Sequence, residues 1–246
     1  MKTSVRYLLL LFFLITLSLN SHSFAADKRF SSAETRVSLI ELYTSEGCSS
    51  CPPAEKWMNA LIDDPQLWQQ FVPVAFHVDY WDYIGWKDPF ADKQHGLRQR
   101  QYKEQGNIFS VYTPGVLLNG KEWRKWRYAR RIPVAQEAAG TLDVEILDNR
   151  IKAIFTPADG QIEDWELNIA LLGFDLRSNV RAGENAGRSL EQEFVVLNHV
   201  KETSSTGQWQ LPVPVAKKTL SGRKGLAAWV NKKGSQTPLQ ATGGWL

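Results

Sequence analysis

The sequence predicts an α/β domain over residues 30–140, followed by a β-rich, antiparallel sandwich-like domain over residues 141–246. The first domain is indicated by an apolar, β-branched run at 37–43 that precedes an amphipathic helical pattern from Ala54 to Ile62. The second is indicated by short apolar runs at regular intervals after residue 140, which are typical of antiparallel sheets. No low-complexity linker separates the two parts, so we expect them to pack together.

The chain begins with a secretory leader pattern. Lys2 and Arg6 precede a largely apolar run of ten residues at 8–17, and Ser23 and Ala25 are small residues at the two positions that a signal peptidase reads. The apolar run is shorter than the roughly 20 residues of a bilayer span. We therefore expect a signal peptide at 1–25, a periplasmic or secreted protein, and no membrane anchor after cleavage.

The charge balance is close to neutral. Cleavage after Ala25 leaves 27 basic and 26 acidic side chains, which does not indicate nucleic acid as a partner. One basic cluster, KEWRKWRYARR at 121–131, interleaves tryptophan with lysine and arginine. A nucleic-acid or lipid surface is one interpretation of it, and a solvated or interface-forming face is the favoured one.

Cys48 and Cys51 are the only cysteines of the chain. A disulfide over so short a loop constrains little of the unfolded chain, so a structural staple is disfavoured. The Cys-Ser-Ser-Cys spacing suits thiol–disulfide exchange, in which one thiolate attacks and the other resolves, or half of a metal site. With no further cysteine available, we expect exchange chemistry and neither a metal nor a cofactor.

The residues around the pair predict strand, loop, motif and helix. Pro52 and Pro53 fit a first helical turn, where backbone N–H groups have no intrahelical partner. Cys48 is then expected at the exposed helix N-terminus, where the dipole favours a thiolate, and Cys51 about one turn further in as the shielded resolving thiol. A further strand is predicted within 71–81, and a helix from an Asp88-Pro89 start to Gly106.

A second motif follows in VYTPGVLLNG at 111–120, where Thr113-Pro114 precedes a strand-like run that ends in an Asn-Gly turn. Cys-x-x-Cys after a first strand, with a Thr-Pro before such a hairpin, resembles the thioredoxin-like superfamily. ELYTSEGCSSCPPAEKW, HVDYWDYIGWKDPF, RQRQY, VYTPGVLLNG and GENAGRSL together resemble an exported bacterial thioredoxin-like family of unknown function, over residues 36–200.

The superfamily resemblance implies a thioredoxin-like fold for the first domain and a thiol–disulfide oxidoreductase activity. It implies that the Thr113–Pro114 peptide is cis and faces Cys48 and Cys51, and that the backbone at Thr113 pairs with the substrate chain. It also implies a buried acid under the motif, for which Glu41 is the candidate. The expected partners are thiols or disulfides of exported proteins and an unidentified redox partner.

Several interpretations stay open from the sequence alone. Glu41 is either a proton acceptor or part of an edge-of-sheet salt bridge, His77 is a core residue or a copper ligand beside the cysteines, and Glu46 is expected to be a solvated loop acid. GENAGR at 183–188 is expected to be a tight turn, with a loop folded back toward the cysteines as the alternative.

The aromatic cluster Tyr80, Trp81, Tyr83 and Trp86 either walls the site or packs in a crossover. Two alternative functions remain, a periplasmic copper-binding chaperone and a partner-binding protein with a non-catalytic cysteine pair.

Overall fold

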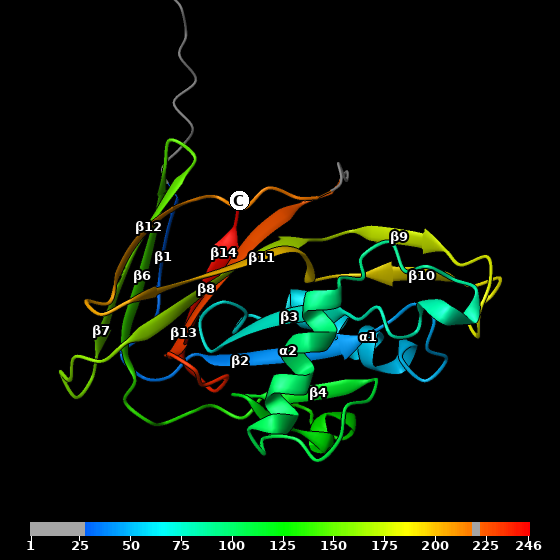
Figure 1. Cartoon of the computed structure of the whole chain (residues 1–246), viewed down its shortest axis with the longest axis horizontal. Helices are drawn as coiled ribbons and strands as arrows, with labels where there is room; N and C mark the ends of the chain where they lie inside the picture. The colour runs from blue at the N-terminus through cyan, green and yellow to red at the C-terminus, as the bar shows by residue number, and fades with distance from the viewer. Residues whose placement is uncertain (1–27, 218–221) are drawn as a thin grey trace, which may run out of the picture.

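The computed structural model describes residues 28–217 and 222–246 (Figure 1). Strands account for 43% of the structure and helices for 14%. The strands form an eight-stranded, a four-stranded and a two-stranded sheet. The fold is therefore mainly β, and the predicted α/β thioredoxin-like fold with a sandwich behind it is wrong. The predicted signal peptide lies outside the described residues, and none of the helices described is long and apolar enough to cross a membrane.

The elements follow one another along the chain in this order, with η marking 3-10 helices: β1 (Lys28–Ser31), β2 (Ser38–Thr44), α1 (Pro52–Asn59), η1 (Ala60–Asp63), β3 (Phe71–His77), η2 (Asp82–Ile84), α2 (Lys93–Glu104), β4 (Gly115–Leu118), β5 (Lys121–Glu122), η3 (Arg124–Arg127), β6 (Gly140–Leu147), β7 (Arg150–Pro157), β8 (Trp165–Gly173), β9 (Leu176–Asn179), β10 (Ser189–Gln192), β11 (Val195–Ser204), β12 (Gln208–Pro212), β13 (Lys224–Lys232) and β14 (Pro238–Trp245).

The eight-stranded sheet explains why the predicted fold class is wrong. Its strand order is β14-β13-β8-β11-β3-β2-β4-β5, so strands from both halves of the sequence share one sheet. The junction is β11, which pairs parallel with β3 at Val195 and Ala75 and antiparallel with β8. An apolar run predicts a strand but not its partner, and β3 and β11 are more than a hundred residues apart in the sequence. The later strands therefore extend the sheet that the early strands form (Figure 1).

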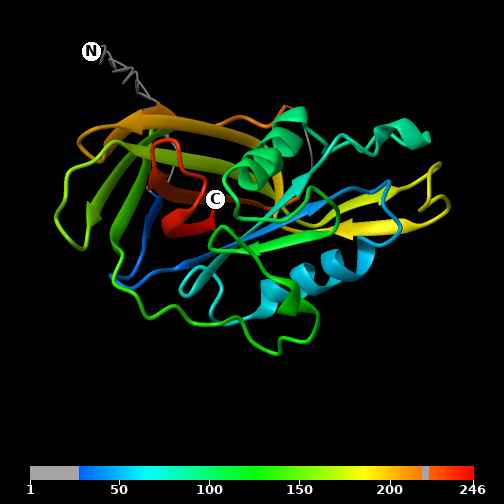
Figure 2. The ribbon, with the colours of Figure 1, turned by 60° about the horizontal axis from the view of Figure 1, so that its bottom comes forward.

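The two α-helices lie on opposite faces of this sheet near β2 (Figure 2). Side chains alternate along a strand, so Glu41 and Tyr43 of β2 face one side and Thr44 the other. Tyr43 packs edge-on against Tyr102 of α2, with ring centroids 6.5 Å apart. Thr44 donates a 2.6 Å hydrogen bond to Glu55 of α1. The face of each β2 side chain is thus fixed by its helix partner.

The four-stranded sheet, in the order β1-β6-β7-β12, packs over β8 and β13 with a core of its own. This core includes Leu142 and Ile151 from one layer and Leu167 and Leu226 from the other. β6 and β7 form a hairpin that turns at Asp148-Asn149, and both of these residues have positive φ, 48° and 61°. Such angles are those of the turns that suit the twist of a two-residue hairpin.

Local boundaries differ from the prediction at both α-helices. α2 begins four residues later than expected, because Asp92 and not Asp88 caps it by accepting a hydrogen bond from the backbone N–H of Gln94. α1 begins at Pro52, so that Cys51 is its N-cap residue and Cys48 lies in the turn before it. The helical pattern through Ile62 is confirmed, with its last residues in η1.

Candidate functional site

Cys48 and Cys51 form a disulfide at the start of α1, with Cα atoms 5.5 Å apart. The expectation that Cys48 is exposed is not met, since Cys48 is 1% exposed and Cys51 is 0% exposed. Only Ser49 and Ser50, which stand between them, face solvent. The Ser50 hydroxyl lies 3.3 Å from Sγ of Cys48. The pair is thus covered, and the cover comes from segments far away in the sequence.

The cis peptide between Thr113 and Pro114 is confirmed. It directly precedes β4, which runs antiparallel to β2 with Gly115 opposite Tyr43. In an antiparallel pair the beginning of one strand lies at the end of the other. The end of β2 also leads into the Cys48 loop, so the cis peptide and the disulfide lie at the same end of the sheet.

Trp81 connects the two motifs. Its indole N–H donates a 2.7 Å hydrogen bond to the hydroxyl of Thr113. Its Cβ is so close to Gly47 that a Cβ on that glycine would lie 3.2 Å from it and from Ile84 Cδ1. A side chain at position 47 would therefore require Trp81 or Ile84 to shift by a few tenths of an ångström next to Cys48. Of the two interpretations for the aromatic cluster, the wall beside the motif therefore applies to Trp81.

The GENAGR segment covers the disulfide. It is the tip of the β9–β10 hairpin, which extends beside the α1 end of the sheet (Figure 1). Asn185, fully buried, donates hydrogen bonds to the carbonyl oxygens of Glu46, at 2.8 Å, and Cys48, at 2.9 Å. Glu184 accepts a 2.9 Å hydrogen bond from the backbone N–H of Ser49. The alternative of a loop folded back toward the cysteines is therefore the observed one.

The same hairpin is also held at its base. Asn59, the last residue of α1, donates to the carbonyl of Glu191 at 2.8 Å and accepts from the backbone N–H of Glu193 at 3.2 Å. The hairpin therefore follows α1 from the helix end to the disulfide. Its tip lies against the loop that carries the two buried cysteines.

A buried charged cluster lies behind the Cys48 loop. His77 Nδ1 is 2.8 Å from Asp88 Oδ2, and the same oxygen accepts a 2.8 Å hydrogen bond from the backbone N–H of Glu46. Burial alone would lower the pKa of His77, but the charge of Asp88 and its hydrogen bond overcome this effect and raise the pKa to about 9. Burial acts to raise the pKa of Asp88, but the charge of His77 holds it below its usual range. The two shifts favour an imidazolium beside a carboxylate, whereas the buried Nε2 of His77 has no hydrogen-bond partner among the described residues.

Glu46 and Glu55 are the two other acids of this cluster. Glu46, expected to be solvated, is fully buried and accepts a 2.8 Å hydrogen bond from the indole of Trp86. Burial and the charge of Asp88 raise the pKa of Glu46. Glu55 is buried four residues after Cys51, hence on the same side of the helix, and burial raises its pKa as well. Neither acid stands out in the sequence, because a lone glutamate in a loop or helix is usually solvated.

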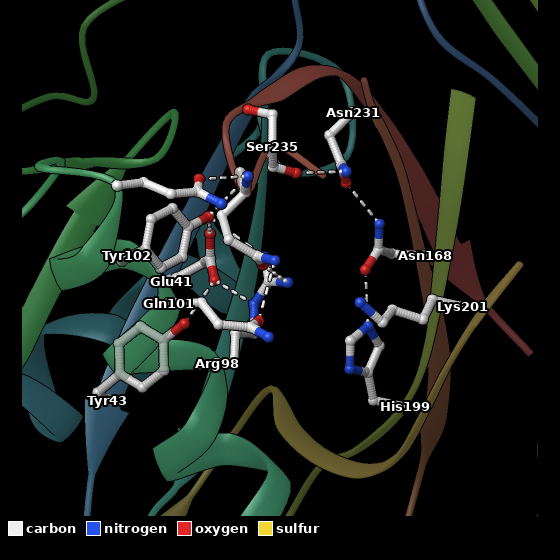
Figure 3. A network of polar contacts seen from close by, with 12 residues as sticks. Glu41, Tyr43, Arg98, Gln101, Tyr102, Asn168, His199, Lys201, Asn231 and Ser235 are labelled. Carbon is white, nitrogen blue, oxygen red and sulfur yellow. Dashed lines mark hydrogen bonds and ion pairs between the residues drawn. The ribbon is translucent and has the colours of Figure 1, made fainter. Parts of the chain in front are cut away.

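Glu41 lies in a polar network with Tyr43, Arg98 and Tyr102 (Figure 3), and it is not brought together with the disulfide. It lies on the face of β2 that α2 covers, whereas the motif helix covers the other face. There it accepts hydrogen bonds from Arg98 and Tyr43, both at 2.9 Å, and another from Tyr102. Arg98 also donates to Gln236 at 2.8 Å. Glu41 is thus one half of a buried ion pair, in a strand flanked on both sides by other strands.

The described residues contain no group of three or more histidine, cysteine, aspartate or glutamate side chains that could hold a metal ion. His77, which was considered as a third ligand beside Cys48 and Cys51, instead directs Nδ1 at Asp88. The arrangement therefore offers a disulfide, a cis-proline loop and two buried acids of raised pKa, which are groups suited to thiol and proton transfer.

Comparisons with known proteins give a family and a fold. A family model described as a protein of unknown function, DUF1223, matches residues 39–231. A crystal structure from Agrobacterium tumefaciens, determined by a structural genomics consortium, is similar with a TM-score of 0.61 and 20% identity, covering 87% of this chain and 96% of that one. HBP35 of Porphyromonas gingivalis is similar with a TM-score of 0.59 and 12% identity, covering 87% and 76%. At such identities the likeness concerns the fold alone. No curated protein matches the chain.

Proposed function

This chain belongs to the DUF1223 family of proteins of unknown function, and we propose that it exchanges disulfides with exported proteins through Cys48 and Cys51. The observation that carries the proposal is the meeting of a four-residue disulfide loop with a cis-proline loop at one end of a sheet. A disulfide that closes so short a loop contributes little to stability, so the protein can undergo reduction and reoxidation of this bond without a large loss of stability.

The oxidised protein would accept electrons in two steps. A substrate thiolate attacks Sγ of Cys48, the bond to Cys51 breaks, and a mixed disulfide forms while Cys51 leaves as a thiolate. A second substrate thiolate then attacks the substrate sulfur of the mixed disulfide, which forms the substrate disulfide and releases the thiolate of Cys48. The protein gains the two electrons that the substrate loses. In the reverse direction the reduced protein passes them to a substrate disulfide.

Glu55 is the proposed proton partner of Cys51. It lies one helical turn after Cys51 and is buried, and its raised pKa lets it hold a proton closer to neutral pH than an ordinary glutamate. It would protonate the Cys51 thiolate when the disulfide opens and take the proton back when the disulfide closes. Glu41, on the other face of β2, is committed to Arg98 and has no such path.

The Thr113–Pro114 loop is the proposed contact for the substrate chain. Thr113 is fixed by Trp81, so the backbone before β4 is held rigid beside the disulfide loop. A rigid edge of this kind lowers the entropy lost when an extended chain pairs with it.

Two measurements test the proposal. The first is the equilibrium between the oxidised and reduced protein in glutathione buffers, read by mass after alkylation of free thiols. A potential near about −120 mV would suit an oxidant and one near about −270 mV a reductant. A pair that stays oxidised in every such buffer would refute an exchange role.

The second measurement is trapping in cells, followed by acid quenching and mass spectrometry. The variant Cys51→Ser keeps the attacking thiol but cannot resolve, so it should accumulate mixed disulfides with exported proteins. The variant Cys48→Ser should accumulate few. The two variants change the same atoms, so one is the control for the other. Equal trapping by both variants, or none by either, would contradict the assignment.

A further inference from the structure

The basic segment 121–131 forms an exposed cationic surface. Its six cations all face solvent, while Glu122 is the only acid among them. These cations, here called the cationic strip, are Lys121, Arg124, Lys125, Arg127, Arg130 and Arg131. Five positive charges in excess within eleven residues stand out in a chain whose formal net charge is +3.

The strip is fixed to the helix that begins at the disulfide. Trp123 and Trp126, which alternate with the cations, are buried and pack against Trp57 of α1 with ring centroids 5.7 and 5.5 Å apart. In Figure 2 the segment after β4 and β5 lies directly beside α1. The tryptophans thus orient the segment, and the cations between them must point away from the protein.

A pocket of about 260 Å³ connects the strip to the cis-proline loop. Its lining includes Pro114 and Tyr112 on one side and Trp123, Trp126, Arg124 and Arg127 on the other. A hollow of this size accepts one large side chain. The cis-proline loop, which would pair with a substrate chain, therefore borders the same pocket as Arg124 and Arg127 of the strip.

Most charges of the strip are without an acidic partner. Glu122 accepts from Nε of Arg124 at 2.9 Å and from the hydroxyl of Tyr112. Arg127 lies over the ring of Trp126, 5.2 Å from its centroid. Arg124 is the one cation of the strip that forms a salt bridge with a carboxylate within residues 28–217 and 222–246. An uncompensated field of this kind attracts anionic groups and raises their local concentration.

We propose that the cationic strip and its pocket dock an acidic stretch of the substrate polypeptide next to the substrate cysteine. The inference rests on the proposed exchange function and names its substrate class. Trp57 lies six residues after Cys51, which is about 9 Å along a helix. An extended chain covers that distance in about three residues. The favoured substrate therefore carries aspartate or glutamate within a few residues of its cysteine, with a large apolar side chain between them for the pocket.

A polypeptide suits this surface better than nucleic acid or lipid. Nucleic-acid and membrane surfaces use extended fields of like charge, whereas the positive charge here is confined to one segment of a nearly neutral chain. The pocket adds a single concave contact beside the cis peptide, which fits one side chain of an extended chain.

The test uses three peptides of equal length with one cysteine each, activated as a mixed disulfide with thionitrobenzoate. Acidic, neutral or basic residues flank the cysteine. The reduced Cys51→Ser protein attacks the peptide sulfur, and the coloured thionitrobenzoate anion leaves. We expect the acidic peptide to react about tenfold faster than the neutral one at low salt, and the basic one more slowly. The difference should vanish at high salt, because the screening length falls from about 10 Å at 0.1 M to about 3 Å at 1 M.

A charge-reversal pair identifies the surface. In the double variant Arg127→Glu, Arg130→Glu, the acidic peptide should no longer react faster than the neutral one. The control Arg150→Glu, Lys152→Glu makes the same change in net charge on β7 of the other sheet and should keep the preference for the acidic peptide. The neutral variant Arg127→Gln, Arg130→Gln serves if the reversed charges prevent folding.

The outcomes separate this inference from the function it rests on. Reaction with neutral hydroxyethyl disulfide, but with equal rates for all three peptides, would overturn the inference and leave the exchange function standing. No reaction with any disulfide would overturn both. Salt-sensitive binding of a single-stranded oligonucleotide or of anionic phospholipid vesicles, with no preference among the peptides, would assign the strip to those partners and overturn the inference.

Discussion

The side-chain amide of Asn185 donates a 2.9 Å hydrogen bond to the carbonyl oxygen of Cys48, across 137 positions of the chain. The same amide donates a second hydrogen bond to the carbonyl oxygen of Glu46. Its side-chain oxygen, Oδ1, accepts a third from Arg188 at 2.9 Å. The hairpin tip is thus tied to the disulfide loop by Asn185, and also by Glu184, which accepts a hydrogen bond from the backbone N–H of Ser49. Since both cysteines are buried in the oxidised protein, we expect this tie to limit how readily a thiol reaches them.

Asn185→Ala should speed reduction of the disulfide. The change leaves two buried carbonyl groups without their donor, which costs about 1–3 kcal/mol in the closed state. The tip then opens more often, and the rate of reduction by a small thiol should rise about tenfold while the protein loses some stability. Stopped-flow measurement with dithiothreitol gives the rate, and urea denaturation gives the free energy of unfolding.

Asn198→Ala is the matched control, because Asn198 also donates to a backbone carbonyl, that of Val215, but on β11. It should leave the reduction rate unchanged. An unchanged rate in Asn185→Ala, despite a loss of stability, would show that the hairpin does not limit access.

Glu55→Gln should slow the resolving step of exchange, and Glu41→Gln should not. Glutamine keeps the shape of either side chain but cannot exchange a proton, and only Glu55 lies on the helix face of Cys51. We expect about a tenfold loss for Glu55→Gln, within the range that one general acid contributes. The measurement is the rate at which a preformed mixed disulfide decays. It is followed as a function of pH, from the pKa of an ordinary glutamate up to the pKa of an ordinary thiol.

Glu41→Gln is the comparison variant for stability. It leaves Arg98 as a buried charge without its carboxylate, which is expected to destabilise the protein by about 3–5 kcal/mol. A selective loss of exchange rate in Glu41→Gln, with stability retained, would restore the sequence-based assignment and contradict this one.

His77 should be charged at pH 7, whereas His95 should be neutral. Asp88 raises the pKa of His77 to about 9, and burial lowers that of His95 to about 4. Because the pKa of His77 is higher in the folded state than its unfolded value of 6.5, its pair with Asp88 stabilises fully below pH 6.5 and loses this contribution as pH rises through 9. The loss is on the order of 3 kcal/mol.

Nitrogen NMR of the two imidazole rings at pH 7 checks the charge states, and urea denaturation from pH 6 to 10 checks the stability. The raised pKa values of Glu46 and Glu55 act in the same direction, since a buried acid that prefers its proton also favours the fold at lower pH. Stability that stays level or rises from pH 6 to 10 would contradict the imidazolium assignment.

The sequence predicts single elements well because their signals are local. The period of apolar residues specifies β2 and the α1–η1 helical segment, and Asp148-Asn149 specifies the hairpin between β6 and β7. The cis peptide before Pro114 followed from a resemblance and not from a physical rule, since most X-Pro bonds are trans.

The sheet order and the covering of the site could not be predicted in the same way. The pairing of β11 with β3 and the contact of Asn185 with Cys48 join distant segments, and neither leaves a periodic signal in the sequence. The burial of Glu46 and Asp88 follows from these tertiary contacts as well. An isolated acid beside a motif is usually solvated, so the sequence alone favours the wrong surroundings for Glu46, and for Asp88 it favours a helix cap instead of the observed pair with His77.

Trp81→Phe should weaken exchange with polypeptides more than reduction by small thiols. Phenylalanine keeps an aromatic ring against Gly47 but loses the N–H that holds the Thr113 hydroxyl at 2.7 Å. The backbone before Pro114 then has more freedom, and a chain that pairs with it must lose more entropy on binding. We expect the ratio of the peptide rate to the dithiothreitol rate to fall about tenfold, since small errors in position are costly for a reacting sulfur.

Thr113→Val removes the same bond from the other side, so the double variant should lose no more than either single one. Trp209→Phe is the control, because it removes an indole hydrogen bond of 2.9 Å to the carbonyl of Glu202 and should lower stability by a similar amount, about 1 kcal/mol, at an unchanged ratio. If Trp81→Phe and Trp209→Phe change the ratio equally, the bond to Thr113 has no role in binding the substrate chain.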